Sequence, residues 1–554
     1  PAYPQASLWL AHVQMWNDEP LATWQASAAR ALVNPSKLGS TDLALARALS
    51  SLGTGQFPDA CDRYRRIIAQ RPADFVAWFG LGQCQSKDRA VERDAGSPSG
   101  WRFRSSYNGA VQAYRRALQL IPAAHRAFGR FSRLSDLIYF TETNQVRAGY
   151  VLTPDTQWYG ALPSLDHDTL AFVPYRLSDV FAAKPEATPP TTAAAVAHNR
   201  AVLRDITTGW VRAFPSSPEA NEALALVLES TGDLADPRNS DQSALSNVRR
   251  ARSASSAPDD RLRLGIIEVR LLVKLEDFAA ARRLADSLLN TIAEPDARAA
   301  EQLAALAALT GRAHRTAQLL IRAAPDLTIE SDGRQIVVRP LSLANAAFAL
   351  RGYAALGAPA DSITTLARRV SSLIDASIEP QRREAMRYAI LSHPIEWALP
   401  LLPAQAPRRG TPGERSRRLV WALEHHDTLT IRATLDTLHA ARADLRPGDV
   451  AISGTYLEAR VLLAIGDTAA ATDLIGRPLE AIATLGTGLL DNVDQAGALV
   501  RAMALRADLA RRAGDSVTAR RWAAPVVELW ERADDPELLA TWERMRIIAG
   551  NRTH

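Results

Sequence analysis

Residues 96–107 carry the most distinctive chemistry of the chain, because aromatic and guanidinium side chains alternate there. Trp101 and Phe103 alternate with Arg102 and Arg104. Aromatic faces stack on planar ligands, and guanidinium groups bind carboxylates or phosphates through paired hydrogen bonds. The stretch is therefore a candidate binding loop. The alternative, which we favour, is that both aromatic side chains anchor the loop to the helices beneath it while both arginines are solvated.

A second candidate site follows from the side chains along two predicted helices, one beginning near Phe75 and the other lying around Phe128. In a chain of stacked helix pairs, the first helix of each pair lines the inner groove. Such a groove would suit an extended peptide with acidic groups, because Lys and Arg form charge-assisted hydrogen bonds with carboxylates. Ordinary solvated helix faces are the alternative. The predicted lining residues are Phe79, Gln83, Ser86, Lys87, Arg126, Arg133 and Asp136.

Two clusters of metal-ligand side chains occur, and neither has the spacing of a metal site. Glu424, His425, His426 and Asp427 are consecutive, so the two imidazoles point about 100° apart on a helix. We interpret them as a helix C-terminus, where positive side chains are favourable. We interpret residues 166–168, Asp-His-Asp, as the polar tip of a loop. The sequence therefore predicts no metal site and no cofactor.

Motifs of the common enzyme classes are not found. The chain has no Gly-x4-Gly-Lys-Ser/Thr loop, and Gly486 and Gly488 have no predicted strand before them. The segment 96–100 is not a nucleophile elbow, because a proline follows Ser97. Carboxylate pairs for acid–base catalysis do not stand out among 60 acidic residues. We therefore predict no catalytic residues and a protein that is not an enzyme.

The chain has two cysteines, Cys61 and Cys84. Cys61 lies early in one predicted helix, and Cys84 lies late in the next. Neighbouring antiparallel helices place the start of one beside the end of the other, so the two side chains can meet. We expect a disulfide if the compartment is oxidising. Two small buried side chains in a helix interface are the alternative.

These candidate residues are carried by a repeated pattern between Thr41 and Pro122. Small residues at fixed spacing let two helices approach, and aromatic residues fill the space between them. The period of about 34 residues resembles the tetratricopeptide repeat, or TPR. The first copy has Gly55, Phe57, Ala60, Tyr64, Ile67 and Pro72, and the second has Trp78, Gly82, Tyr107, Ala110, Tyr114, Ala117 and Pro122.

The fold class that follows is mostly all-α, a TPR-like α-solenoid of antiparallel helix pairs with small β-hairpin insertions. One hairpin is indicated by Asp332-Gly333 between apolar runs, and two further strands are predicted at 146–152 and 169–175. The predicted segments are an N-terminal helical cap at 1–40, repeats at 41–140 with an inserted loop at 88–105, a β insertion and linker at 141–192, helical pairs at 193–325, a β-hairpin at 326–340, and helical pairs with a cap at 341–554.

The net positive charge of the chain could indicate nucleic-acid binding, but the distribution of the basic residues along the chain does not support it. Net charge is +5 and the pI is about 9.3. Only four of the 65 basic residues are lysines, and the arginines are spread along the chain rather than clustered. Long arginine stems also cover apolar surface well. No nucleic-acid partner is expected, because no basic run or compact basic domain occurs.

Three stretches also resemble the repeat-rich region that follows the membrane helix in some bacterial serine/threonine kinase-like proteins. They are residues 78–84, 97–107 and 529–536. The Gly-rich loop, His-Arg-Asp and Asp-Phe-Gly motifs of the kinase half are missing here, so the resemblance implies no kinase activity. It implies a bacterial, extracytoplasmic array that binds proteins.

The sequence and this resemblance lead to an expected cellular location and to two hypotheses about function. No run of 18 uncharged apolar residues is present, so no transmembrane segment is predicted. The chain begins at Pro1, and we expect that a signal peptide or an upstream domain has been removed. The first hypothesis is a periplasmic or cell-surface scaffold that holds a peptide or protein. The second is a structural or accessory subunit of a larger assembly, such as a filament or a membrane complex, in contact with other copies of itself.

Overall fold

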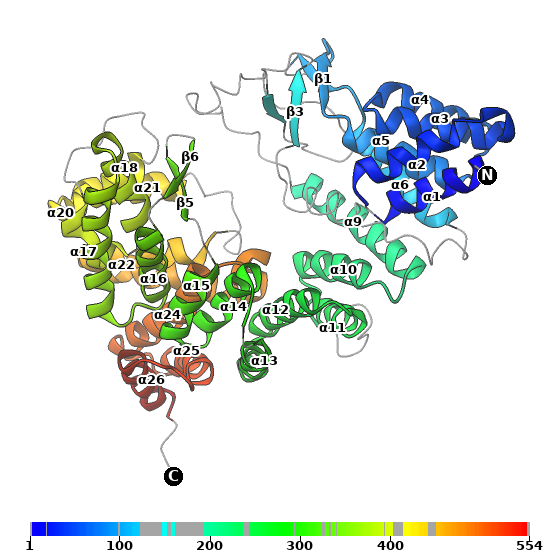
Figure 1. The fold of residues 1–554 in the computed structure, drawn as a ribbon. Coiled ribbons are helices and arrows are strands. Elements are labelled where there is room, and N and C mark those ends of the chain that lie inside the picture. The colour runs from blue at the N-terminus through cyan, green and yellow to red at the C-terminus, as the bar shows by residue number, and fades with distance from the viewer. Residues whose placement is uncertain are drawn as a thin grey trace. The chain divides into compact units, whose positions relative to one another are not determined.

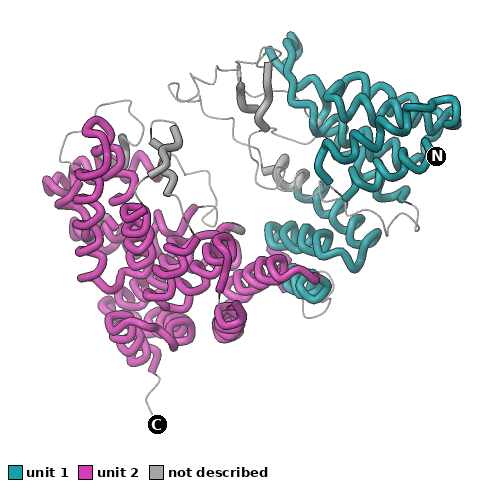
Figure 2. Tube along the Cα trace, viewed as in Figure 1, with its two compact units in different colours: residues 1–231, 241–254 teal, residues 232–240, 255–554 magenta. Residues whose placement is uncertain are grey.

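The computed structural model describes two compact units of the chain, each built mainly from helices (Figure 1). Unit 1 comprises residues 1–231 and 241–254, and unit 2 comprises residues 232–240 and 255–554 (Figure 2). The residues described are 3–17, 19–97, 100–121, 147–151, 157–160, 193–235, 243–292, 294–323, 327–331, 334–338, 341–392, 394–402, 414–440 and 450–550.

Unit 1 consists of successive helix pairs and a small sheet. The pairs α3–α4 and α5–α6 are the two predicted repeats. The helices are α1 (Pro4–Trp16), α2 (Leu21–Ala31), α3 (Ser40–Gly53), α4 (Phe57–Gln70), α5 (Phe75–Lys87), α6 (Tyr107–Leu120), α9 (Ala193–Ala213), α10 (Pro218–Thr231) and α11 (Ala244–Ala254), and the strands are β1 (Ala90–Arg93), β2 (Trp101–Phe103), β3 (Arg147–Val151) and β4 (Gln157–Gly160).

Close approach of the helices in these repeats depends on two glycines of α5. A Cβ atom at Gly80 would lie 2.2 Å from the Tyr64 ring, and one at Gly82 would lie 2.8 Å from the Tyr114 ring. Tyr64 and Tyr114 are buried, so neither ring has room to move aside. The predicted small position Gly82 and the predicted aromatic position Tyr114 therefore meet, and Gly80 adds a contact with Tyr64 that the sequence pattern did not specify.

The insertion at 88–105 forms a hairpin that the sequence analysis did not predict. β1 and β2 pair antiparallel, and β1 also pairs parallel with β3, which gives the order β2-β1-β3-β4. β3 lies at the strand predicted for 146–152. The strand predicted for 169–175 lies outside the described residues.

Cys61 on α4 and Cys84 on α5 form a disulfide, with an S–S distance of 2.05 Å and Cα atoms 5.6 Å apart. The two helices are antiparallel neighbours, so the early position of one faces the late position of the next. Both cysteines are buried beside the Tyr64–Gly80 contact. The bond therefore fixes the interface between the two repeats.

Replacing both cysteines with alanine should destabilise unit 1 by about 3 kcal/mol. The bond closes a loop with a sequence separation of 23, and the chain-entropy relation gives that magnitude. Urea unfolding of the double variant and of the wild type with and without reductant measures the loss. An unchanged unfolding midpoint for both the double variant and the reduced wild type would contradict this prediction.

Unit 2 contains helix pairs, short helical turns and one β-hairpin. Its helices are α12 (Pro258–Lys274), α13 (Phe278–Thr291), α14 (Ala297–Leu309), α15 (Ala313–Ala323), α16 (Leu341–Leu356), α17 (Ala360–Ser377), α18 (Pro380–Leu391), α19 (Ile395–Ala398), α20 (Glu414–Glu424), α21 (Thr428–Ala440), α22 (Ile452–Ala464), α23 (Thr468–Glu480), α24 (Val493–Arg512), α25 (Ser516–Leu529) and α26 (Pro536–Ala549). Strands β5 (Leu327–Ser331) and β6 (Arg334–Val338) pair antiparallel at the predicted hairpin.

One turn design recurs within the helix pairs of both units. A residue with positive φ ends the first helix; its N–H donates to the carbonyl three residues back, and the next N–H donates five residues back. These two bonds define a Schellman motif, which satisfies carbonyls at a helix end. Within the described residues the motif occurs at Gly55, Glu276, Gly311, Gly357, His426, Gly466 and Gly514.

The residue after the turn decides how the second helix is capped. Asp277, Asp427, Asp467 and Asp515 each accept a hydrogen bond from the backbone N–H three residues on. This is the preferred N-cap arrangement. The turns at Gly311 and Gly357 are followed by Arg312 and by Ala358-Pro359, which cannot act in this way.

Acidic residues near the C-terminus cap these two helices instead. Asp534 accepts hydrogen bonds from the backbone N–H groups of His314 and Arg315 at the start of α15, both at 3.2 Å. Glu537 accepts from the N–H of Ala360 at the start of α17, at 3.0 and 3.2 Å. The C-terminal segment of unit 2 therefore completes two helices that lie far from it in the sequence.

Asp534→Ala and Glu537→Ala should each destabilise unit 2 by about 1 kcal/mol, the usual cost of a lost N-cap. Hydrogen exchange should rise both in the first turn of α15 or α17 and in the segment 530–540. Glu528→Ala, on the exposed side of α25, is the matched control and should change neither. Faster exchange confined to residues 530–540 would show that the caps contribute nothing to α15 and α17.

Unit 2 departs from a simple stack in chain order, because α24 packs against helices that are distant in sequence. α24 contacts α14 and α16 as well as its neighbours α22, α23 and α25 (Figure 1). A Cβ atom at Gly497 would lie 2.2 Å from the Ala355 carbonyl oxygen, and Asp494 accepts two hydrogen bonds from Arg351 at 2.7 and 2.9 Å. The last repeats therefore fold back onto the first repeats of this unit.

Candidate functional site

The predicted inner groove of the first repeats is covered in the structure. Phe79 and Gln83 are each 1% exposed, so neither can line an open groove. The Trp16 ring of α1 lies against Phe79, and the Lys87 ammonium lies 5.7 Å from the centroid of the Trp24 ring of α2. The sequence prediction is wrong here because residues 1–40 do not only cap the end of the array. They also pack across its inner face.

The arginines of the inserted loop are held by acidic residues of the same insertion. Arg104 donates two hydrogen bonds to Asp88 at 2.8 and 2.9 Å, and Ser105 donates a third at 2.7 Å. Arg102 pairs with Glu92 and lies 3.6 Å from Asp94. The prediction that both guanidinium groups are solvated is therefore wrong, because each is paired with a carboxylate. The acidic residues at 88, 92 and 94 were the signal that this interpretation missed.

The aromatic residues of the loop pack onto its own hairpin. Phe103 is fully buried beside Val91, and Trp101 packs against that pair. The guanidinium of Arg93 lies 4.5 Å from the centroid of the Trp101 ring. Of the remaining predicted groove residues, Arg126 and Arg133 lie outside the described residues.

A partly enclosed cavity lies in unit 2, between α21 and the pair α22–α23, and has a volume of about 410 Å³. Pockets of this size hold small ligands or side chains of a partner. We call it the α21–α23 groove. Its lining residues are Arg432, Leu435, Asp436, His439, Val450, Thr455, Leu462, Asp467, Ala470, Asp473, Leu474, Arg477 and Pro478.

The groove lies between two helix pairs that are joined by a longer stretch of chain than the first repeats are. Residues 71–74 join α4 to α5, which pack closely, whereas residues 441–451 separate α21 from α22. A longer connection does not force one helix pair tightly against the next. The sequence analysis did not find this site, although the length of the connection was a signal for it.

Apolar side chains form the floor of the groove. Leu435 and Leu462 are buried, and Leu474 is half-buried. Pro478 lies inside α23 and has no N–H, so the Leu474 carbonyl lacks its usual donor four residues on. The floor therefore offers mainly apolar surface.

Charged side chains line the rim. Arg432 donates a hydrogen bond to Asp467 at 2.8 Å, which links α21 to the start of α23, and Arg477 pairs with Asp473. Asp436 is exposed. The lining residues include three aspartates and two arginines, so carboxylates outnumber guanidinium groups by one on the rim.

His439 joins the rim to a buried carboxylate. Its Nε2 lies 3.0 Å from Oε2 of Glu458, and the Glu458 side chain is 9% exposed. Glu458 belongs to α22, so this contact holds the two helices together at the end of the groove that faces residue 440. The contact adds another carboxylate close to the rim.

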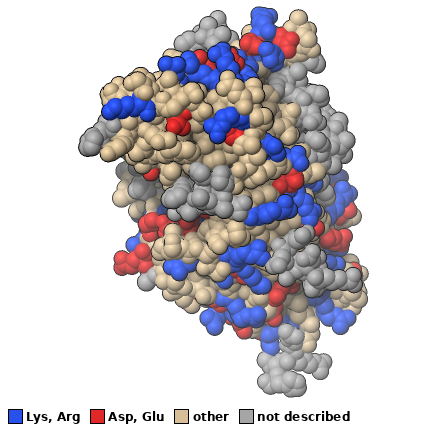
Figure 3. Space-filling view, turned by 90° about the vertical axis from the view of Figure 1, so that its right-hand side faces the viewer, with Lys and Arg blue, Asp and Glu red and all other residues tan. Residues whose placement is uncertain are grey.

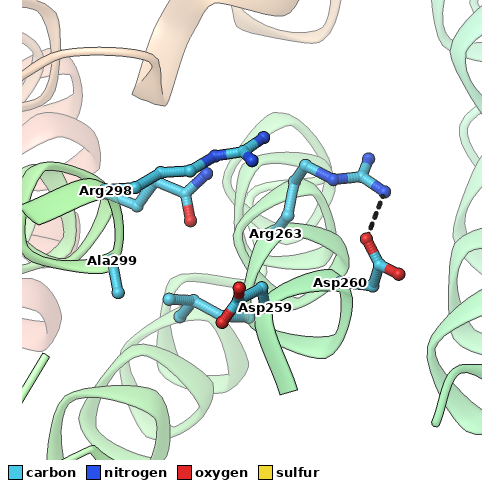
Figure 4. A pocket seen from close by; sticks show the side chains of 7 residues that line it. Asp259, Asp260, Arg263, Arg298 and Ala299 are labelled. Carbon is cyan, nitrogen blue, oxygen red and sulfur yellow. Dashed lines mark hydrogen bonds and ion pairs between the residues drawn. The ribbon is translucent and has the colours of Figure 1, made fainter. Parts of the chain in front are cut away.

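Two other hollows of unit 2 are poorer candidates. One, of about 20 Å³, lies between the starts of α12 and α14, where Arg263 donates a hydrogen bond to Asp260 at 3.3 Å and Arg298 lies nearby (Figure 4). It has room for a single water molecule. The other, of about 510 Å³, is an open surface hollow lined by residues that include Arg312 and Asp534.

No group of three metal-ligating side chains is found within the described ranges. His425 stacks on Trp421 with ring centroids 4.4 Å apart, and its Nδ1 lies 2.8 Å from the Trp421 carbonyl oxygen. His426 adopts the positive-φ position of a Schellman motif. These two imidazoles therefore serve the end of α20.

On the face drawn in Figure 3, Lys and Arg are spread widely, with Asp and Glu among them. Pairs such as Arg460 with Glu396, at 2.7 Å, are typical of unit 2. Among the residues the structure describes, no helix is both long and apolar enough to cross a membrane.

The chain is thus a mostly α-helical, TPR-like protein of antiparallel helix pairs. No protein-family profile matches it, and no curated protein sequence does so. Solved structures similar to it include a chain of the Naa15/Naa10 complex bound to HypK-THB, with 12% identity, a TM-score of 0.27, and coverage of 99% of this chain and 79% of that chain.

Two further similar structures have comparable values. Yeast Tom70 has 11% identity, a TM-score of 0.24, and coverage of 98% of this chain and 96% of that chain. The P58(IPK) TPR domain has 10% identity, a TM-score of 0.18, and coverage of 93% and 99%. Such TM-scores do not define a shared arrangement of helices.

Proposed function

We propose that the protein is a non-enzymatic protein-interaction scaffold and that the α21–α23 groove holds a segment of its partner. The observation that carries this proposal is a groove of about 410 Å³ with a leucine floor and a charged rim, formed between consecutive helix pairs. Binding sites for partner side chains combine apolar floors with a few fixed polar groups.

The lining indicates what the partner segment contains. An apolar side chain fits the floor formed by Leu435, Leu462 and Leu474. A neighbouring basic side chain would meet Asp436 on the negative rim. We therefore propose a peptide segment with a large apolar residue next to Lys or Arg.

Binding of two matched synthetic peptides tests this function. Both are ten residues long and differ only in having Leu-Arg or Leu-Glu at the centre. We expect the Leu-Arg peptide to bind at least tenfold more tightly by fluorescence anisotropy, a difference of about 1.4 kcal/mol, because the rim is negative.

Variants of the protein locate the binding. Leu474→Glu should weaken binding of the Leu-Arg peptide at least tenfold, because it places a carboxylate in the apolar floor. Asp436→Lys should abolish the preference for the Leu-Arg over the Leu-Glu peptide. Glu528→Lys is the control, because it changes the charge by the same amount as Asp436→Lys, at an exposed position of α25. Equal affinities of all variants for both peptides would refute binding at this groove.

We further propose that the protein works outside the cytoplasm. The Cys61–Cys84 disulfide supports this setting, because such bonds persist in oxidising compartments. Trapping free thiols with a maleimide at the moment of cell lysis tests it. A chain that reacts at both cysteines in its native cell would overturn the proposal.

A further inference from the structure

The helical hairpin α1–α2 of unit 1 lies on the face of α5 that the sequence predicts to bind ligands. The Trp16 ring centroid lies 5.1 Å from that of Phe75 and 6.5 Å from that of Phe79. Phe79 in turn makes an edge contact with Tyr114, at 5.4 Å between centroids. Trp16 is 1% exposed, so it fills an aromatic site on α5 completely.

The second helix of the hairpin covers the other end of the same face. The Lys87 ammonium lies 5.7 Å from the Trp24 ring centroid. Trp24 also lies against α3, since a Cβ atom at Gly53 would be 2.9 Å from its ring, and Gln25 donates a hydrogen bond to the Gly53 carbonyl. The two tryptophans therefore seat the hairpin at both ends of α5.

Gln83 lies between these two contacts. Phe79, Gln83 and Lys87 are four residues apart and share one face of α5. Gln83 is 1% exposed, and its Nε2 has no hydrogen-bond partner. A buried donor without an acceptor carries a desolvation penalty. The α5 face between the two tryptophan contacts therefore contains a buried polar group without a partner.

The hairpin carries a similar defect of its own. His12 of α1 is fully buried, and neither ring nitrogen has a hydrogen-bond partner, although the ring stacks on Trp16 at 5.7 Å between centroids. A permanent core position is normally apolar or has its polar groups paired. The hairpin therefore also contains a buried polar group without a hydrogen-bond partner.

We propose that α1–α2 is an internal ligand that reversibly covers a second interaction surface, the Phe75–Phe79–Gln83 face of α5. This surface is separate from the α21–α23 groove and belongs to unit 1. Its external occupant is an amphipathic helix of a partner protein with an aromatic anchor in place of Trp16. An oxygen acceptor on that helix accepts a hydrogen bond from the Gln83 amide.

The connection between hairpin and repeats allows a direct test. Residues 33–37 are exposed, so a protease recognition sequence can be inserted between Asn34 and Pro35. The full chain is folded, cleaved there and mixed with an excess of a fluorescent synthetic peptide of residues 3–33. We expect the peptide to replace the cleaved hairpin while hydrogen exchange in α3, α4 and α6 stays slow.

Two peptide variants make the exchange specific. Trp16→Ala in the peptide should weaken its binding at least tenfold, because the aromatic site on α5 is left empty. Leu10→Ala changes a residue on the exposed side of α1 and is the matched control, with unchanged binding expected. Equal binding of the Trp16→Ala peptide would overturn the proposal.

Two further measurements test whether α1–α2 leaves α5 reversibly and whether the unpaired Gln83 amide promotes its release. If α3, α4 and α6 lose protection together with the hairpin, α1–α2 is an integral part of the core and the proposal fails. Gln83→Leu should slow release of the cleaved hairpin several-fold, because it removes the unpaired amide. Release at the wild-type rate would remove the argument from Gln83 and contradict the proposal.

Discussion

Replacing Gly497 with alanine should open unit 2 and cost it more than about 4 kcal/mol, a loss seen only when a core contact is destroyed. The added Cβ would lie 2.2 Å from the Ala355 carbonyl oxygen and 2.8 Å from its carbon. Both atoms are backbone, so the clash is relieved only by moving α24 away from α16. Such a movement also disturbs the buried contact between α24 and α14.

Hydrogen exchange measured by mass spectrometry checks this prediction element by element. Amides of α14, α16 and α24 should exchange much faster in Gly497→Ala than in the wild type, whereas unit 1 should be unaffected. Gly454→Ala is the matched control, because this glycine of α22 has open space around its Cβ position. It should stabilise its helix by about 0.5–1 kcal/mol. Slow exchange in the Gly497 variant would contradict the packing of α24.

Acid should destabilise unit 1 through His12. Burial lowers the pKa of this imidazole from its ordinary value of 6.5 to about 3. The unfolded chain therefore takes up a proton near pH 6.5, and the folded chain does so only near pH 3. The stability is intact above pH 6.5 and falls by about 1.4 kcal/mol for each pH unit below it, several kcal/mol by pH 4.

His12→Phe isolates this effect, because a phenyl ring preserves the stack on Trp16 and cannot be protonated. Urea unfolding of unit 1 between pH 4 and 7 should show the loss in the wild type and a much flatter dependence in the variant. His425→Gln, at an exposed position of unit 2, should retain the wild-type slope. A slope that survives in His12→Phe would assign the acid sensitivity to other groups.

The local structure of the repeats follows from the sequence because it depends on near neighbours. Gly82 stands four residues after Trp78, and Tyr114 stands at a fixed offset in the paired helix, so spacing alone predicts their contact. The turn at Glu276-Asp277-Phe278 is of the same kind, since its left-handed residue and its N-cap are adjacent.

The covered faces depend on contacts between distant segments and could not be predicted in this way. Nothing in the spacing around Phe79 indicates that Trp16 lies on it. A weaker signal did exist in unit 2. The α14 segment 303–309 is apolar on all sides and fully buried, and a helix of that kind is surrounded by others. Arg312 at a position where other turns have Asp was a second signal of a distant cap.

The α21–α23 groove shows the same limit. Its floor comes from α21, α22 and α23, and its volume is set by how far the two helix pairs stand apart. Sequence patterns specify each pair but not that distance. The predicted sites, by contrast, lay on single helices or one loop, where Arg102 and Arg104 turned out to be engaged by neighbouring carboxylates.

Selection from a random peptide library on immobilised full-length protein tests the central claim, that the α21–α23 groove binds a partner segment. Parallel selections use the wild type, Leu474→Glu and the control Glu528→Lys. We predict that the wild type and the control enrich peptides with a large apolar residue beside Lys or Arg, and that Leu474→Glu does not. Enrichment of the same peptides on all three proteins, or of none with this pattern, would contradict the claim.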